Sequence, residues 1–152
     1  MQPLNVGQKR IFEGKHSDLS EKIIKIFYQV HTELGYGFSE KVYQKAFGIA
    51  LREARMIVDE QVPIKVYYHG QVVGDFFADM LINGVILLEL KSVASIIDEH
   101  EAQLLNYLKA TEIEVGYVMN FGKSATFKRK VFDNDRKGSL RWTEKQKIRD
   151  LP

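Results

Sequence analysis

The 152-residue sequence contains no cysteine, which excludes disulfide bonds, cysteine-based zinc fingers and iron–sulfur clusters held by thiolates. No apolar run approaches the roughly 20 residues that a membrane-spanning helix needs, so we expect no membrane association. The polar N-terminal segment, residues 1–18, lacks the apolar core of a signal peptide, and we therefore expect a cytoplasmic protein. The sequence also lacks internal repeats and obvious linkers, which favours one domain.

The composition is that of a globular protein, with 45% hydrophobic and 28% charged residues. The net charge is only +2, but residues 123–152 hold ten Lys and Arg against four Asp and Glu. A solvated basic tail explains this excess. A patch for an anionic partner, nucleic acid first, explains it as well, and both interpretations stay open.

Hydrophobic periodicity predicts two helices at the start of the chain. Apolar side chains recur at helical spacing over residues 18–35, and Gly35 and Gly37 end that helix. A second helix is expected over 39–55, with Ser39 as its N-cap.

The remaining sequence predicts strands around one further helix. Strands are expected over 62–68, 72–82 and 85–90, and the last is apolar on both faces, as a central strand is. Asp98 opens a helix to about 110, with Glu101 in a capping-box position. Strands over 115–121 and 125–132 follow, the second a basic edge strand. This order predicts an α/β sandwich with a mixed sheet.

The segment "LLELK", residues 87–91, ends the most apolar strand with opposite charges two residues apart. Glu89 and Lys91 share one face of that strand. A two-residue turn at Asn83-Gly84 would place Asp79 opposite Leu88, so that the two carboxylates face opposite sides of the sheet. A three-residue turn, or a bulge, would pair Asp79 directly with Glu89. The sequence does not choose between these registers.

Two interpretations of these charges compete. Lys91 could simply neutralise Glu89 as a structural ion pair. If Asp79 is adjacent, however, two close carboxylates repel each other unless a cation lies between them. Oxygen ligands suit Mg²⁺ or Mn²⁺, and such an ion can polarise a phosphate and activate water. Lys91 could then orient the water or stabilise charge on the phosphoryl oxygens.

Three further polar residues fit the second interpretation. Gln103 and Tyr107 are four apart on the third predicted helix and share a face. Glu40 lies on the stripe of Tyr43 and Phe47, so we expect it to point inward at the start of its helix. An exposed Gln, a half-buried core Tyr and an N-terminal Glu that offsets the helix dipole are the plainer explanations.

Several blocks together resemble a known family. "GFSEKVY", residues 37–43, matches the signature of the GxxExxY protein family, and "FFADM", "LLELKS", "QLLNYLKA" and "VGYVMNFG" resemble its further blocks in the same order. The resemblance covers about residues 18–131. That family is similar to the PD-(D/E)xK nuclease superfamily, with a restriction-endonuclease-like mixed sheet flanked by helices, and the motifs look like those of RecB-type and CRISPR-associated exonucleases.

The resemblance implies a role for each residue. Asp79, Glu89 and the Leu90 backbone carbonyl would bind Mg²⁺ or Mn²⁺, Lys91 would be the catalytic lysine, and Glu40 would be an accessory carboxylate and a further candidate ligand. Gln103 and Tyr107 would contact DNA or order the site. In the basic strand we expect Lys128, Arg129 and Lys130 to contact the substrate.

The sequence therefore predicts an N-terminal extension over 1–17, a nuclease-like domain over 18–132 and a basic tail over 133–152. We expect a metal-dependent nuclease acting on DNA rather than RNA, and a homodimer is left open. The rival hypotheses are an inactive nucleic-acid-binding or regulatory module that keeps the fold, and a purely structural domain with incidental ion pairs.

Overall fold

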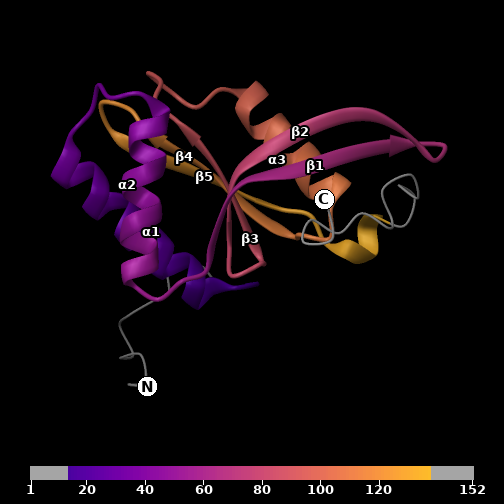
Figure 1. Ribbon diagram of the computed structural model, residues 1–152, viewed down its shortest axis with the longest axis horizontal. Helices are drawn as coiled ribbons and strands as arrows, with labels where there is room; N and C mark the ends of the chain where they lie inside the picture. The colour runs from indigo at the N-terminus through magenta and orange to yellow at the C-terminus, as the bar shows by residue number, and fades with distance from the viewer. Residues whose placement is uncertain (1–13, 138–152) are drawn as a thin grey trace.

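The computed structural model describes residues 14–137, and Figure 1 shows how its elements are arranged. Three α-helices, five strands and a short 3₁₀-helix follow one another along the chain. In chain order they are α1 Ser17–Leu34, α2 Glu40–Glu53, β1 Val58–Tyr68, β2 Gln71–Ile82, β3 Ile86–Lys91, α3 Asp98–Ala110, β4 Val115–Phe121, β5 Ala125–Val131 and η1 Asn134–Lys137.

The five strands form one mixed sheet in the order β1-β2-β3-β4-β5. Neighbouring strands are antiparallel except β3 and β4, which are parallel and are joined through α3. The predicted α/β fold with a mixed sheet is confirmed, as are the central position of β3 and the edge position of β5.

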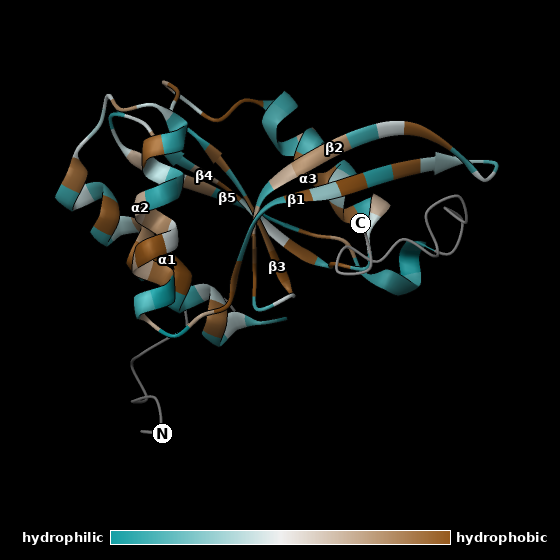
Figure 2. Ribbon diagram, in the orientation of Figure 1, coloured by the Kyte–Doolittle hydropathy of each residue, from teal (hydrophilic) through white to brown (hydrophobic). Residues whose placement is uncertain are grey.

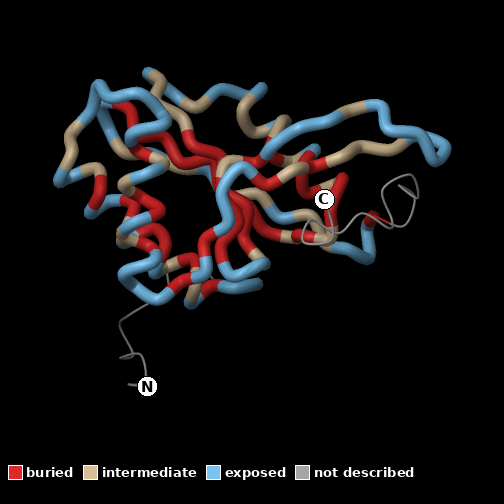
Figure 3. Tube along the Cα trace, in the orientation of Figure 1, coloured by how far each residue is buried: buried red, intermediate tan, exposed pale blue. Residues whose placement is uncertain are grey.

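Helices cover both faces of the sheet. Side chains of α1 and α2 form one buried cluster with the sheet, and side chains of α3 form a second cluster on the other face. Figure 1 shows α1 and α2 on one side and α3 on the other, and Figure 3 shows the buried segments concentrated between them. In Figure 2 the apolar residues follow the same central strands.

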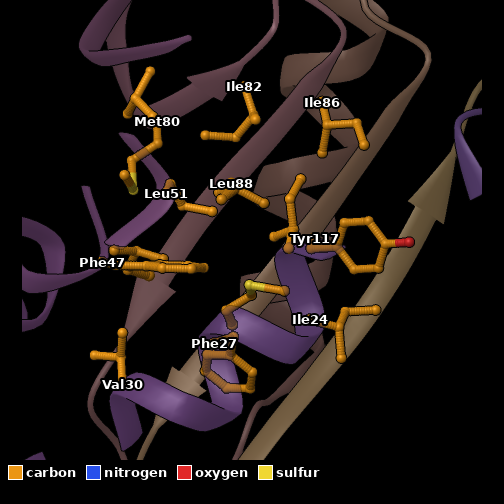
Figure 4. Packing of buried hydrophobic residues seen from close by; sticks show 14 of the residues in the cluster. Ile24, Phe27, Val30, Phe47, Leu51, Met80, Ile82, Ile86, Leu88 and Tyr117 are labelled. Atoms are coloured by element: carbon orange, nitrogen blue, oxygen red, sulfur yellow. The ribbon is translucent and has the colours of Figure 1, made fainter. Parts of the chain in front are cut away.

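The larger cluster is built by alternation along the strands. Ile86 and Leu88 of β3 point to the α1–α2 face and belong to the cluster that holds Phe27 and Phe47, whereas Leu87 between them belongs to the α3 cluster. Figure 4 shows this packing from close by. All seven residues of β4 are buried, as expected for a strand covered on both faces.

Helix α3 begins at Asp98 as predicted, but its capping differs from the prediction. Its N-cap is Ile97 rather than Asp98, and the Ile97 backbone N–H donates to Nδ1 of His100 at 3.2 Å. Glu101, the predicted capping residue, instead forms a 2.9 Å ion pair with Lys130 of β5. A nearby ammonium outcompetes a backbone amide for this carboxylate, because charge-assisted hydrogen bonds are the stronger ones.

Two boundaries bear on the predicted domain limits. After β5, Lys137 at the end of η1 is buried and donates from Nζ to the carbonyls of Thr111 and Ile113, at 2.9 and 2.8 Å. The start of the predicted basic tail is thus attached to the domain, while its residues 138–152 lie outside the described residues, as does most of the predicted N-terminal extension. No helix among residues 14–137 is long and apolar enough to cross a membrane.

The loop between α1 and α2 is held by a tyrosine of the following helix. Gly35 and Gly37 have φ angles of 72° and 109°, a region that favours glycine. The buried Tyr43 hydroxyl donates to the Gly35 carbonyl at 2.6 Å and accepts from the Phe38 N–H at 3.4 Å. The tyrosine therefore fixes the path of the chain into α2.

Replacing Tyr43 with Phe should lower the free energy of unfolding by about 1 kcal/mol, because the Gly35 carbonyl loses its partner. Urea denaturation measures this loss. Tyr28→Phe, an exposed tyrosine on α1, is the matched control and should have no effect. Equal stability of the two variants would show that the Tyr43 hydroxyl does not hold the loop.

Candidate active site where two strands separate

The register between β2 and β3 is the one that brings the two carboxylates together. Their pairs are Met80 with Leu88, Leu81 with Leu87 and Ile82 with Ile86, which leaves a three-residue turn from Asn83 to Val85. Asn83 and Gly84 both have positive φ, of 51° and 70°. The next opposed pair along the strands is Asp79 and Glu89, where the ladder of backbone hydrogen bonds has ended.

At that position the side chains replace the backbone ladder. The Asp79 N–H donates to Oε1 of Glu89 at 3.1 Å, and the Leu90 N–H donates to Oδ2 of Asp79 at 2.7 Å. Each carboxylate thus binds a backbone amide of the opposite strand. We call this arrangement the carboxylate clasp. It fixes both acids on rigid elements and satisfies amides that the separating strands would otherwise leave unpaired.

Lys91 lies beside the clasp. It follows Glu89 by two residues on β3, so both side chains point to the face that also carries Leu87. Glu89 is only 5% exposed, whereas Lys91 is half-buried. The Lys91 ammonium is close enough to lower the pKa of both Asp79 and Glu89. Burial, the largest effect on both carboxylates, acts in the opposite direction and raises their pKa.

Burial raises the pKa of Asp79 in spite of its hydrogen bond from Leu90. Burial, followed by repulsion from Asp79, raises the pKa of Glu89 to about 8, and Glu40 adds a smaller repulsion. Without a cation, the site therefore keeps a proton on Glu89 at neutral pH. Such a shift is typical of functional carboxylates, although structural clusters can produce it too.

Helix α2 brings a polar row to the same place. Glu40 is exposed in the first turn of α2, not pointed into the core as predicted, but its charge still reaches Glu89. One turn later, Gln44 donates to the Asp79 carbonyl at 3.4 Å and to Glu60 at 3.1 Å. Gln61 donates to the Gln44 side chain at 3.1 Å. These amides hold β1 and α2 beside the clasp.

Helix α3 contributes the predicted Gln and Tyr. Gln103 Nε2 donates to the Tyr107 hydroxyl at 2.9 Å, so the two do share a face. Tyr107 is buried, and its pKa is raised by burial and then by the charge of Glu89. Both residues therefore lie on the helix that faces the clasp.

The three basic residues of β5 are Lys128, Arg129 and Lys130. Within residues 14–137 none of them contacts Asp79 or Glu89. Arg129 donates to the Tyr117 hydroxyl at 2.5 Å, to Ser20 of α1 at 3.3 Å and to the Lys15 carbonyl. Lys130 pairs with Glu101 on the opposite face of the sheet. Lys128 is exposed. Of the three, Lys128 is thus the most accessible to a nucleic acid.

Sequence reasoning missed the residues that hold the end of β3. Asn120 is 1% exposed in β4, beside Lys91 in the parallel register. Its side chain accepts from the Val93 N–H at 3.0 Å and donates to the Val93 carbonyl at 2.9 Å. A single polar residue inside the apolar run 115–121 is the signal that could have found it. Ser92 adds a hydrogen bond to the Phe38 carbonyl at 3.1 Å.

The donor set fits one hard divalent cation. Among residues 14–137 no three His, Asp or Glu side chains converge in metal-binding geometry, so an ion here would depend on two carboxylates, backbone oxygen and water. Mg²⁺ is commonly bound in this way. Burial and then repulsion from Asp79 raise the pKa of Glu89, and a cation between the two carboxylates would relieve that repulsion.

The raised pKa predicts a pH dependence of stability. Folded Glu89 keeps its proton to about pH 8, whereas an unfolded Glu loses it near 4.5. The folded state therefore binds more protons in this window, and the stability present below pH 4.5 is lost as the pH rises to 8. The loss should reach up to about 1.4 kcal/mol per pH unit.

Glu89→Gln keeps the acceptor for the Asp79 amide but cannot ionise, so its stability should depend less on pH and should exceed that of the wild type above pH 8. Denaturation across this pH range in chelator provides the measurement. Glu53→Gln, at the exposed end of α2, is the control. Parallel curves for the wild type and Glu89→Gln would show that Glu89 titrates normally.

A family comparison agrees with this geometry. The family model of the PD-(D/E)XK nuclease superfamily matches residues 17–131, which include every element from α1 to β5. No curated protein and no solved structure matches the chain significantly. The matched range covers three quarters of the sequence and contains Asp79, Glu89 and Lys91. The chain belongs to the PD-(D/E)XK nuclease superfamily.

Proposed function

We propose that this protein is a divalent-metal-dependent nuclease that hydrolyses DNA phosphodiester bonds at the carboxylate clasp. The observation that carries the proposal is the clasp itself, with Lys91 on the same strand face as Glu89. Within the superfamily we assign the chain to the GxxExxY family, because Gly37, Glu40 and Tyr43 match its signature. DNA, rather than RNA, follows from the resemblance to RecB-type and CRISPR-associated exonucleases.

Asp79, Glu89 and the Leu90 carbonyl would hold Mg²⁺ or Mn²⁺, which would supply a Lewis acid for the phosphate and lower the pKa of a bound water. Hydrogen bonds from Leu90 to Asp79 and from Asp79 to Glu89 keep the carboxylates oriented before substrate arrives. In holding a cation Glu89 would be ionised, because the positive charge would offset both burial and repulsion.

Lys91 supplies the positive charge that is independent of any metal. The backbone that carries it is held at the end of a buried strand, since Asn120 binds the N–H and carbonyl of Val93 two residues later. In that position it can stabilise negative charge that develops on the phosphoryl oxygens, or hold the attacking water by a hydrogen bond. Glu40 would act as the accessory carboxylate, and Gln103 and Tyr107 would position the DNA backbone beside the clasp.

A second function is a nucleic-acid-binding module without turnover. One observation favours it: only two carboxylates are built into the clasp, while Glu40 is exposed and is not joined to them by a hydrogen bond among the described residues. A weakly held cation would then leave a fold that binds DNA and cuts it slowly or not at all.

Lys91→Met should abolish metal-dependent cleavage and leave DNA affinity nearly unchanged, because catalysis needs the ammonium in the transition state whereas binding needs distributed positive charge. Asp79→Asn should also abolish cleavage and should weaken Mn²⁺ binding. The assay incubates purified protein with single- and double-stranded DNA and RNA, with Mg²⁺ or Mn²⁺ against chelator. Calorimetry measures the metal binding.

Lys91→Arg is the matched control, since it keeps the charge but changes the shape of the donor. If it cleaves like the wild type, a diffuse charge is sufficient and no specific lysine chemistry is needed. If the wild type itself cleaves nothing and Lys91→Met melts at a much lower temperature, Lys91 is a structural counter-ion and the binding module replaces the nuclease.

The basic strand can be tested separately. Lys128→Glu should weaken DNA binding and reduce the slope of log affinity against log salt by about 1, because one phosphate contact is lost. Lys25→Glu on α1, also exposed, is the control for net charge. Arg129→Glu is unsuitable because it would break contacts to Ser20 and Tyr117. Equal salt slopes for the wild type and the two lysine variants would exclude Lys128 from the interface.

A further inference from the structure

A cavity of about 680 Å³ lies between α3 and the far half of the β1–β2 hairpin. Its walls are mostly apolar: Val66 and Phe76 come from the hairpin, and Ala102 and Tyr107 come from α3. This volume is in the range of small-molecule and cofactor sites, about 300–1,000 Å³. We call it the hairpin pocket. The metal and lysine chemistry proposed for the clasp does not use it.

On the hairpin side, the pocket is lined by the aromatic ring of Phe76. Phe76 and Tyr107 are in contact, with ring centroids 5.8 Å apart and planes tilted by 45°. A Cβ at Gly74 would lie 2.5 Å from the Phe76 ring, so the glycine leaves room for the ring to lie over the strand. Phe76 is 43% exposed, so its ring is an accessible aromatic surface of the kind on which nucleobases stack, while the buried Tyr107 supports it from α3.

The pocket adjoins the carboxylate clasp. Tyr107 lines the pocket and is also near enough to Glu89 and Asp79 to feel their charge. Phe76 precedes Asp79 by three residues on β2, which places their Cα atoms about 10 Å apart along an extended strand. Ala78 and Leu81 both belong to the α3 cluster, so strand alternation is interrupted next to Asp79, and Phe76 and Asp79 lie on the same face. A ligand in the pocket would therefore lie on the α3 face, about 10 Å along the strand from a phosphate at the clasp.

The polar lining suits a neutral, planar ligand with donors and acceptors at its edge. Gln103 and Asn106 each offer a side-chain amide, which both donates and accepts. The charged lining residues are one acid and one base, Glu99 and Lys109, so the pocket has no excess of positive charge to attract a phosphate. A nucleobase fits this combination better than a phosphate does.

We propose that the hairpin pocket receives an unpaired nucleobase of the strand whose phosphate lies at Asp79, Glu89 and Lys91. The proposal rests on the proposed nuclease function and adds a substrate class to it. A base inside a duplex is stacked and paired and cannot enter such a pocket without leaving the helix. The protein should therefore prefer single-stranded DNA, or DNA ends that fray, over continuous duplex.

The matched pair Phe76→Ala and Phe77→Ala tests this. Both residues are partly exposed on β2, at 43% and 56%, but they point to opposite sides of the strand and only Phe76 lines the pocket. Fluorescence anisotropy of the full-length protein, in chelator to prevent cleavage, would measure binding to a labelled single-stranded oligodeoxynucleotide and to a duplex of the same sequence.

Phe76→Ala should weaken single-strand binding by roughly 5- to 150-fold, the equivalent of losing one stacked base. Phe77→Ala should bind like the wild type, and neither change should alter the weaker duplex binding. An oligodeoxynucleotide that carries 2-aminopurine at successive positions should show altered fluorescence at one position, and this change should disappear in Phe76→Ala.

Each of the following binding results would overturn the proposal: equal affinity of the wild type for single strands and duplex, equal effects of the two substitutions, or a change of molecular mass in light scattering for both variants. The last would make the apolar hairpin a contact between two copies of the chain.

If single strands bind through Phe76 but Mn²⁺ produces no cleavage, the pocket assignment stands and the nuclease function fails. If Phe76→Ala cleaves single-stranded DNA at the wild-type rate and with the wild-type affinity, the nuclease function stands and the pocket assignment fails.

Discussion

The rest of the site depends on one constraint: β2 and β3 separate beyond the pair Met80–Leu88, where Asp79 and Glu89 lie. Where a sheet splits, backbone amides lose their partners, and a buried unpaired amide costs about 1–3 kcal/mol. Here the amides of Asp79 and Leu90 are bound by carboxylates instead of carbonyls. The opening therefore need not be a weak point of the fold. The same hydrogen bonds that complete the sheet also bring two acids to one place and fix their direction.

Hydrogen bonds from neighbouring elements fix the backbone of β2 and of the segment after β3 on either side of the clasp. On one side, Gln44 of α2 and Gln61 of β1 form a row of amides that ends on the Asp79 backbone. On the other, Asn120 of the neighbouring parallel strand holds Val93, just beyond Lys91. Each contact is made by a neutral side chain, which adds a hydrogen bond without adding to the charge of the site. The clasp and Lys91 thereby keep the charges to which we assign the proposed chemistry.

Much of the fold follows from local patterns, whereas the site depends on long-range register. The helices at 17–34 and 40–53 and the buried strands at 86–91 and 115–121 agree with hydrophobic periodicity, because their cores are built from stripes and alternation within each element. The choice between two hairpin registers could not be made from sequence, since Asn83-Gly84 suits a two-residue turn as well. The capping of α3 could not be predicted for a related reason: Glu101 is bound by Lys130, which is distant in sequence.

Arg129 shows how far composition can mislead about a binding surface. The run of Lys128, Arg129 and Lys130 looks like one basic patch, but strand alternation sends its members to different faces. Arg129 ties β5 to α1 and Lys130 ties β5 to α3, so two of the three charges are engaged in holding the layers of the domain together. A nucleic acid that approaches the sheet from the α3 side therefore meets only Lys128 of this run as an exposed cation, and needs further contacts beyond it. The proposed base-binding surface at Phe76 would offer such contacts at no cost in net charge, and stacking, unlike phosphate contact, is only weakly screened by salt.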